Sequence, residues 1–162
     1  MNVLITGCSN YIAKDIIKKF LQHKKDNIIA TYRSKKPTIS HKNLRFLKID
    51  LQKKIPKIKN INLLIHCASA TPFKKYNKKE YSKINTLGFK KILRAVINKN
   101  LTHVVLFSTM SVYGKISKDM VDEEYPIKGE TPYALSKIKM EKTLNEFSKK
   151  NLINGLTLRL PG

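Results

Sequence analysis

The sequence predicts a three-layer α/β/α protein, in which helices cover both faces of a doubly wound parallel sheet. Short runs rich in Val, Ile and Leu alternate along the chain with longer stretches of helical period. Several of the short runs are continuously apolar, which is typical of strands buried on both faces of a parallel sheet. The irregular segments 33–43, 50–60, 70–77 and 110–130 mostly follow the end of a strand, and that edge is where such sheets bind ligands.

Each element is placed by its own pattern. Strands are expected at the apolar runs, at 2–6, 27–32, 44–49, 61–66, 103–108 and 156–160. A first helix is expected over 11–24, where Ile12 and Ile16 belong to one apolar stripe, and a second over 78–98 for the same reason. A third helix is expected over 131–150, because Pro132 stands in its first turn, where proline is favoured.

Composition limits the class of protein. At 162 residues the chain has the size of one domain, and its 41% hydrophobic and 27% charged residues are ordinary for a soluble globular protein. No apolar run approaches the roughly 20 residues that cross a bilayer, and the first residues carry no targeting pattern, so we expect a cytoplasmic protein without a membrane partner. Cys8 and Cys67 form neither a disulfide framework nor a metal site, so no metal is expected.

The formal net charge of +22 suggests an anionic partner such as nucleic acid. The excess is almost entirely lysine, whereas recognition of phosphates and bases favours the forked guanidinium of arginine. The lysines are scattered along solvent-type helix faces without interleaved aromatic residues. We therefore expect a solvated surface and no nucleic-acid partner, and a basic nucleic-acid binder ranks third among the interpretations.

The turn after the first strand, TGCSNYIA at 6–13, stands where a dinucleotide site needs glycines. Glycines there allow backbone N–H groups to approach a pyrophosphate and allow the helix to pack closely on the strand. Only Gly7 is present, and Asn10 and Ala13 occupy the second and third glycine positions. Asn tolerates a left-handed backbone, and Ala is the smallest substitute. A plain strand-to-helix turn remains the alternative.

The end of the second strand carries cations where the ribose of an adenosine is normally met. A carboxylate at this point accepts hydrogen bonds from the 2′-hydroxyl, but the chain has Arg33, Ser34 and Lys35, which suit a 2′-phosphate. This pattern favours NADP over NAD. The alternative is that Arg33 is one more exposed cation of a basic surface.

Two further patterns carry possible chemistry. Ser108, Thr109 and Ser111 stand at the end of the fifth strand, where hydroxyls either cap a turn or hold a substrate oxygen. Tyr133 and Lys137 are four residues apart on one helix face, so the ammonium can approach the phenol and lower its pKa towards the range useful for proton transfer. On its own, this pair also fits a tyrosine packed under a surface lysine.

The order of these segments resembles the extended short-chain dehydrogenase/reductases, the NAD(P)-dependent epimerase/dehydratase family that acts on nucleotide sugars. The resemblance covers essentially the whole chain. It is carried, in order, by TGCSNYIA, IDL (49–51), LLIHCASA (63–70), YSKINTLGFKKIL (81–93), FSTMSVYG (107–114), DEEYP (122–126), PYALSK (132–137) and LRLPG (158–162). It implies a Rossmann fold with strand order 3-2-1-4-5-6, bound NAD or NADP and a nucleotide-sugar substrate.

The resemblance also assigns roles to individual residues. Tyr133 would be the catalytic acid/base, Lys137 would lower its pKa and bind the nicotinamide ribose, and Thr109, four residues before Tyr113, would hold the reacting sugar oxygen. Hydride would pass between the sugar carbon and the nicotinamide, so that epimerisation, dehydration and reduction all stay open. Other positions implied to contact or adjoin the cofactor are Gly7, Ser9, Asn10, Tyr11, Ile12, Arg33, Ser34, Asp50, Leu51, Cys67, Ala68, Ser69, Asn85, Pro161 and Gly162.

The chain departs from the family pattern at its end. Family members continue past the LRLPG motif into a smaller lobe that holds most of the sugar pocket, so we expect 1–162 to be one Rossmann domain, truncated before that lobe and weak or inactive alone. Helices 78–98 and 131–150 correspond to those that pair in family dimers, which implies a possible homodimer. A non-catalytic dinucleotide-binding or regulatory domain is the main alternative, supported by Asn10 and opposed by the complete Thr109, Tyr133 and Lys137 set.

Overall fold

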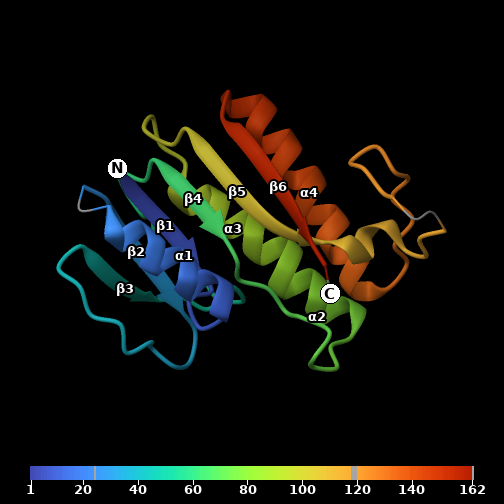
Figure 1. Ribbon diagram of the computed structural model, residues 1–162, viewed down its shortest axis with the longest axis horizontal. Helices are drawn as coiled ribbons and strands as arrows, with labels where there is room; N and C mark the ends of the chain where they lie inside the picture. Colours follow the sequence, from blue (N-terminus) through green and yellow to red (C-terminus); the bar gives the residue numbers. More distant parts are fainter. Residues whose placement is uncertain (24, 118–119, 162) are drawn as a thin grey trace.

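The protein folds around one parallel sheet whose strands follow the predicted order. The computed structural model describes residues 1–23, 25–117 and 120–161, and Gly162 lies outside them. Within this part of the chain, six strands are arranged as β3-β2-β1-β4-β5-β6, and every neighbouring pair is parallel (Figure 1). The strands are β1 (Asn2–Thr6), β2 (Asn27–Tyr32), β3 (Leu44–Lys48), β4 (Leu63–His66), β5 (His103–Thr109) and β6 (Asn154–Leu160).

The strand bounds match the expected runs to within one residue, except at the starts of β4 and β6. β4 begins at Leu63 rather than at Ile61, because Asn60 adopts a positive φ of 59° and turns the chain just before the sheet. β6 begins at Asn154, two residues earlier than the apolar run, and Gly155 pairs with Val104 there. The apolar pattern misses the start of β6 because its first residues are exposed.

The helices also follow the expected segments, with one internal difference. α1 spans Tyr11–Gln22 and α4 spans Pro132–Asn151, whereas Lys24, the end of the expected first helix, lies outside the described residues. The expected second helix is divided into α2 (Lys78–Tyr81), a π-helix (Ser82–Leu87) and α3 (Gly88–Val96). A 3-10 helix, Met110–Tyr113, follows β5 inside a segment that was expected to be irregular.

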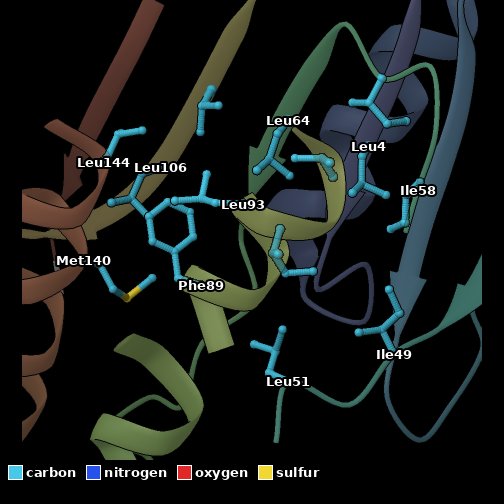
Figure 2. Packing of buried hydrophobic residues seen from close by; sticks show 14 of the residues in the cluster. Leu4, Ile49, Leu51, Ile58, Leu64, Phe89, Leu93, Leu106, Met140 and Leu144 are labelled. Carbon is cyan, nitrogen blue, oxygen red and sulfur yellow. The ribbon is translucent and has the colours of Figure 1, made fainter. Parts of the chain in front are cut away.

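Helices cover both faces of the sheet, which gives the expected three layers. α1 lies on one face, whereas α3 and α4 lie on the other (Figure 1). Successive side chains of β1 point to opposite faces of the sheet. Leu4 packs in the cluster with Phe89 and Met140, whereas Ile5 packs in the cluster with Ile17. Figure 2 shows the first cluster, in which Phe89 lies beside Met140 and Leu106.

The outer strand β6 is only partly covered, with its first three residues exposed. Leu156 on this strand is 52% exposed, and the strand pairs with β5 alone within the described residues. None of the helices in the described part of the chain combines the length and the hydropathy that crossing a bilayer requires. The carboxyl ends of β1, β2, β3 and β4 meet at one edge, and the connections that leave them form the site described next.

Candidate active site

A cavity of about 500 Å³ opens at the carboxyl edge of the sheet. Its wall comes from the segments that follow β1, β2, β3 and β4, on both sides of the point where the strand order reverses between β1 and β4. Many residues implied by the resemblance line it together, namely Gly7, Ser9, Asn10, Arg33, Ser34, Asp50, Leu51, Cys67, Ala68 and Ser69. Lys35, the third residue of the cationic run after β2, also lines it.

The turn after β1 is built for close approach of its backbone. Gly7 has a φ of +74°, and a Cβ atom at this position would lie 2.8 Å from the backbone N of Ala68. Asn10 does not use the left-handed backbone that we expected of it, because its φ is −83°. Instead, the Asn10 side chain caps α1 by accepting from the Ala13 N–H at 2.8 Å and donates to the Cys67 carbonyl at 3.3 Å. The turn therefore keeps its shape with one glycine.

Some residues that the resemblance assigned to the cofactor do not line the cavity. Tyr11, at the start of α1, is 75% exposed, and Ile12 and Pro161 also lie outside the lining. Asn85 is fully buried behind the wall, where its amide accepts from the Ala70 N–H at 2.7 Å and donates to the Ala70 carbonyl at 3.1 Å. Asn85 thus supports the loop after β4 from behind, as an indirect contributor to the cavity.

Several lining residues were not expected from the sequence. Thr31 and Tyr32 end β2, and Gln52 follows the predicted pair Asp50 and Leu51, so their place beside strand ends offered a signal. The 70–77 segment was expected at this edge, but its individual lining residues were not, because an irregular run without a strand or helix period gives no register. They include Thr71, Phe73, Lys74 and Tyr76, and the Phe73 side chain is 96% exposed.

A second group of side chains gathers where β5 ends and α4 begins. The Lys137 Nζ donates to the Phe107 carbonyl at 2.8 Å and lies 5.9 Å from the centre of the Tyr133 ring. The Thr109 side chain lies close enough to the Tyr133 phenol to influence its pKa, and it accepts from the Ser111 N–H at 3.2 Å. Tyr133 and Lys137 therefore converge with Thr109 rather than diverging into solvent.

This group adjoins the cavity through two sets of contacts. The rings of Tyr76, Tyr81 and Tyr133 follow one another, with centroid separations of 5.5 Å and 5.8 Å. In addition, Asn85 Nδ2 donates to Ser136 Oγ at 2.9 Å, and Ser136 Oγ donates to the Tyr133 carbonyl at 2.7 Å. Thr109, Tyr133 and Lys137 do not line the cavity themselves, and these contacts link the Tyr133 ring to it through Tyr81 and Tyr76, of which Tyr76 is a lining residue.

The electrostatics of Tyr133 differ from the expectation. We expected Lys137 to lower the pKa of the phenol, but burial raises the pKa of Tyr133, although Thr109 acts in the opposite direction. Lys137 does not offset the effect of burial on Tyr133, because its ammonium lies towards the Tyr133 ring and donates to the Phe107 carbonyl. Burial also lowers the pKa of Lys137 to about 8, against the opposing influence of Cys67 and Glu141.

An ion pair that the sequence did not suggest lies under this group. Glu141, one helical turn after Lys137, accepts from Arg159 Nη2 at 2.9 Å and from the Ser108 hydroxyl. Arg159 also donates to the Tyr113 hydroxyl at 2.6 Å. These contacts join the ends of β5 and β6 to α4, and so they fix the spacing of the elements that carry Thr109, Tyr133 and Lys137.

His66, at the end of β4, is buried and neutral. Its Nδ1 lies 2.9 Å from Thr6 Oγ1, which also accepts from the Ala68 N–H at 3.2 Å. Burial lowers the pKa of His66 to about 3, with Lys137 contributing. Among the described residues, no three or more His, Cys, Asp or Glu side chains are grouped as metal ligands.

Comparison with known proteins identifies the family of the chain. The sequence model of the NAD-dependent epimerase/dehydratase family matches residues 3–161. A GDP-6-deoxy-D-talose 4-dehydrogenase from Aggregatibacter actinomycetemcomitans is 26% identical over 99% of this chain and 52% of its own length. A UDP-glucose 4-epimerase from Lactobacillus helveticus is 25% identical over 98% of this chain and 51% of its own.

Solved structures agree in fold. The UDP-glucuronic acid 4-epimerase from Bacillus cereus in complex with NAD superposes with a TM-score of 0.84 at 19% identity, over 99% of this chain and 56% of that one. The UDP-Glc/GlcNAc 4-epimerase from Campylobacter jejuni gives a TM-score of 0.83 at 21% identity, over 98% and 52%. The chain spans about half the length of the curated relatives it matches. With residues 3–161 matched and the strand order in agreement, the chain belongs to the NAD-dependent epimerase/dehydratase family.

Proposed function

We propose that this chain is the cofactor-binding part of an NAD(P)-dependent nucleotide-sugar epimerase, dehydratase or reductase. The observation that carries the proposal is the convergence of Thr109, Tyr133 and Lys137 beside a 500 Å³ cavity at the carboxyl edge of the sheet. The relatives it matches have names that denote 4-epimerases, a 4-dehydrogenase and a 4,6-dehydratase of nucleotide sugars. A sugar of this class is accordingly the proposed substrate.

The cavity fits a dinucleotide. Gly7 lets the turn after β1 pack against the backbone of Ala68, because a Cβ there would collide with it, and the start of α1 that follows is where a pyrophosphate would bind. Similar solved structures are described as complexes with NAD. In this chain Arg33, Ser34 and Lys35 line the cavity after β2, with no carboxylate among them, so we propose a preference for NADP.

When bound, the nicotinamide would accept a hydride from the sugar or return one. The residues of this chain then handle the proton and the position of the substrate. The raised pKa keeps the Tyr133 phenol protonated at neutral pH, so it is set to donate a proton to a substrate oxygen. Thr109 would hold that oxygen, and Lys137, which is buried beside the Tyr133 ring, would bind the nicotinamide ribose.

Substitution of Tyr133 by Phe tests this assignment. The ring and its packing against Tyr81 remain, so we expect NADP affinity to stay within about twofold while sugar-dependent cofactor reduction, followed by absorbance in single-turnover experiments, falls at least ~100-fold. An unchanged rate would remove Tyr133 from the mechanism. Failure of the unaltered chain to bind either dinucleotide would remove the proposal as a whole.

A non-catalytic dinucleotide-binding domain is the second candidate. It is favoured by Asn10, which stands in place of a glycine, and by the raised pKa of Tyr133, which opposes proton release. This candidate predicts that Tyr133→Phe changes neither the affinity for NADP nor the rate of sugar-dependent cofactor reduction. Robust turnover by the chain alone would contradict it, and would also contradict our expectation that the chain is weak or inactive without a further sugar-binding lobe.

The proposal includes a cytoplasmic location, no nucleic-acid or membrane partner, and a homodimer through 78–98 and 131–150. The exposed residues of these helices include Leu87 but also Lys90, Lys139 and Lys142, so self-association would bring like charges together. We therefore expect sedimentation to show more dimer at high salt than at low salt. A monomer at every salt concentration would contradict the homodimer.

A further inference from the structure

Lys91 on α3 holds the loop that follows β3. Its Nζ donates to the carbonyl oxygens of three consecutive residues, Leu51 at 3.2 Å, Gln52 at 3.0 Å and Lys53 at 3.1 Å. An ammonium has three N–H donors, so each of them has a partner in this one loop. Hydrogen bonds with a charged donor are roughly twice as strong as neutral ones.

The loop brings these carbonyls together at one point. Asp50 Oδ1 accepts from the Gln52 N–H at 2.9 Å, and the Lys53 N–H donates to the Asp50 carbonyl at 3.0 Å, which closes a tight turn. Carbonyl oxygens that converge in this way repel one another unless a cation lies between them. The Lys91 ammonium takes that place.

The same helix face holds the loop by close packing. Gly88 is three residues before Lys91, so both face the loop. A Cβ atom at Gly88 would lie 2.7 Å from the Leu51 Cβ, and the Leu51 side chain is buried. Leu51 also belongs to the hydrophobic cluster shown in Figure 2. The loop is thus fixed on its apolar side by Gly88 and on its backbone side by Lys91.

The loop is part of the cavity wall, whereas Lys91 is not. Asp50, Leu51 and Gln52 line the cavity on the side of β3, next to the cationic residues after β2. In the proposed function this side receives the adenosine half of the cofactor. Lys91 therefore lies behind the lining residues and would act on the adenosine half only through this loop.

We propose that Lys91 is a positioning residue that sets affinity for the adenosine half of the dinucleotide. The inference rests on the proposed dinucleotide function. Its physical basis is preorganisation, since a loop held in its binding shape loses less freedom when the ligand binds. Without the ammonium the three carbonyls turn towards water, and Asp50, Leu51 and Gln52 lose their common geometry.

The test compares Lys91→Met, which keeps the aliphatic stem, with Lys91→Arg, which keeps the charge. Lys90→Met is the matched control, because Lys90 is exposed, adjacent, and its loss changes the net charge equally. Dissociation constants for NADP, NAD and AMP are measured by calorimetry on the whole chain. We expect Lys91→Met to weaken all three about tenfold, Lys91→Arg to restore most of the affinity, and Lys90→Met to change none of them by more than about twofold.

Each other outcome has a defined meaning. Unchanged affinity in Lys91→Met, or an equal loss in Lys90→Met, overturns the role of Lys91 while leaving the dinucleotide site in place. A loss that affects both NADP and NAD but not AMP also overturns it, because the effect would then lie outside the adenosine half. If Lys91→Met does not fold, Lys91→Gln carries the same test. If the unaltered chain binds none of the three ligands, the proposed function itself fails.

Discussion

Glu141 is the position where a single substitution should destabilise this protein most informatively. Its carboxylate accepts from Arg159 at 2.9 Å and from the Ser108 hydroxyl, and the two charged side chains are only 10% and 19% exposed. Glu141→Gln keeps the shape and removes the charge, which leaves a largely buried guanidinium without its counter-ion. Breaking a buried pair from one side costs about 3–5 kcal/mol. Because Arg159 keeps the Tyr113 hydroxyl at 2.6 Å, we expect the lower end, about 3 kcal/mol.

Urea unfolding followed by circular dichroism at pH 7 measures this loss, with Glu146→Gln as the control on the exposed face of the same helix. A loss of about 3 kcal/mol corresponds to a fall in Tm of roughly 6–12 °C for a chain of this size. The double variant Glu141→Gln/Arg159→Met should recover part of the loss, since no unpaired charge remains. A change below about 1 kcal/mol, or one no larger than that of Glu146→Gln, would refute the reasoning.

Three further substitutions test other contacts. Burial lowers the pKa of Lys137 to about 8 from its usual 10.5, so the unfolded chain binds more protons than the folded chain between these pH values. The free energy of unfolding, relative to that of Lys137→Met, should therefore rise by about 3 kcal/mol from pH 8 to 10.5. A difference in urea midpoints that does not change with pH would contradict this. Because the pKa of His66 is lowered to about 3, the unaltered chain should lose about 1.4 kcal/mol of stability per pH unit below pH 6.5, relative to His66→Gln. Acid unfolding curves that coincide for the two proteins would contradict this prediction. Gly88→Ala should destabilise the chain by about 1–2 kcal/mol, because overlap with Leu51 outweighs the better helix propensity of Ala. An unchanged thermal midpoint would contradict this and would show that the loop with Leu51 moves to make room for the methyl group.

The sheet could be predicted from the sequence because its pattern is local. β1 and β2 coincide with the expected apolar runs, and the resemblance implied the strand order that the structure has. The start of β6 was missed, since Asn154 and Gly155 are exposed and carry no apolar signal. The π-helix at 82–87 was also missed, because a helical stripe over 78–98 shows that a helix exists but not that one turn is wider.

The candidate site could be predicted only as far as its residues lie at strand ends or within short motifs. The resemblance assigned Cys67 and Asp50 to the cofactor site, and both line the cavity, while their contact with a cofactor stays a prediction. The expected lowering of the Tyr133 pKa was wrong, because spacing on a helix does not reveal where the Lys137 ammonium finds its acceptor. Contacts between distant segments, such as Lys91 with the loop after β3, had no sequence signal at all.

The π-helix at 82–87 changes the direction in which side chains point before and after it along one continuous helical segment. An α-helix turns by about 100° per residue, so the additional residue in this wide turn rotates everything before it relative to everything after it by about that angle. Phe89 can then point into the interior while Tyr81 is aimed at Tyr133. Deleting one residue between 82 and 87 would rotate Tyr81 relative to Phe89 and so move it away from its aromatic neighbour Tyr133.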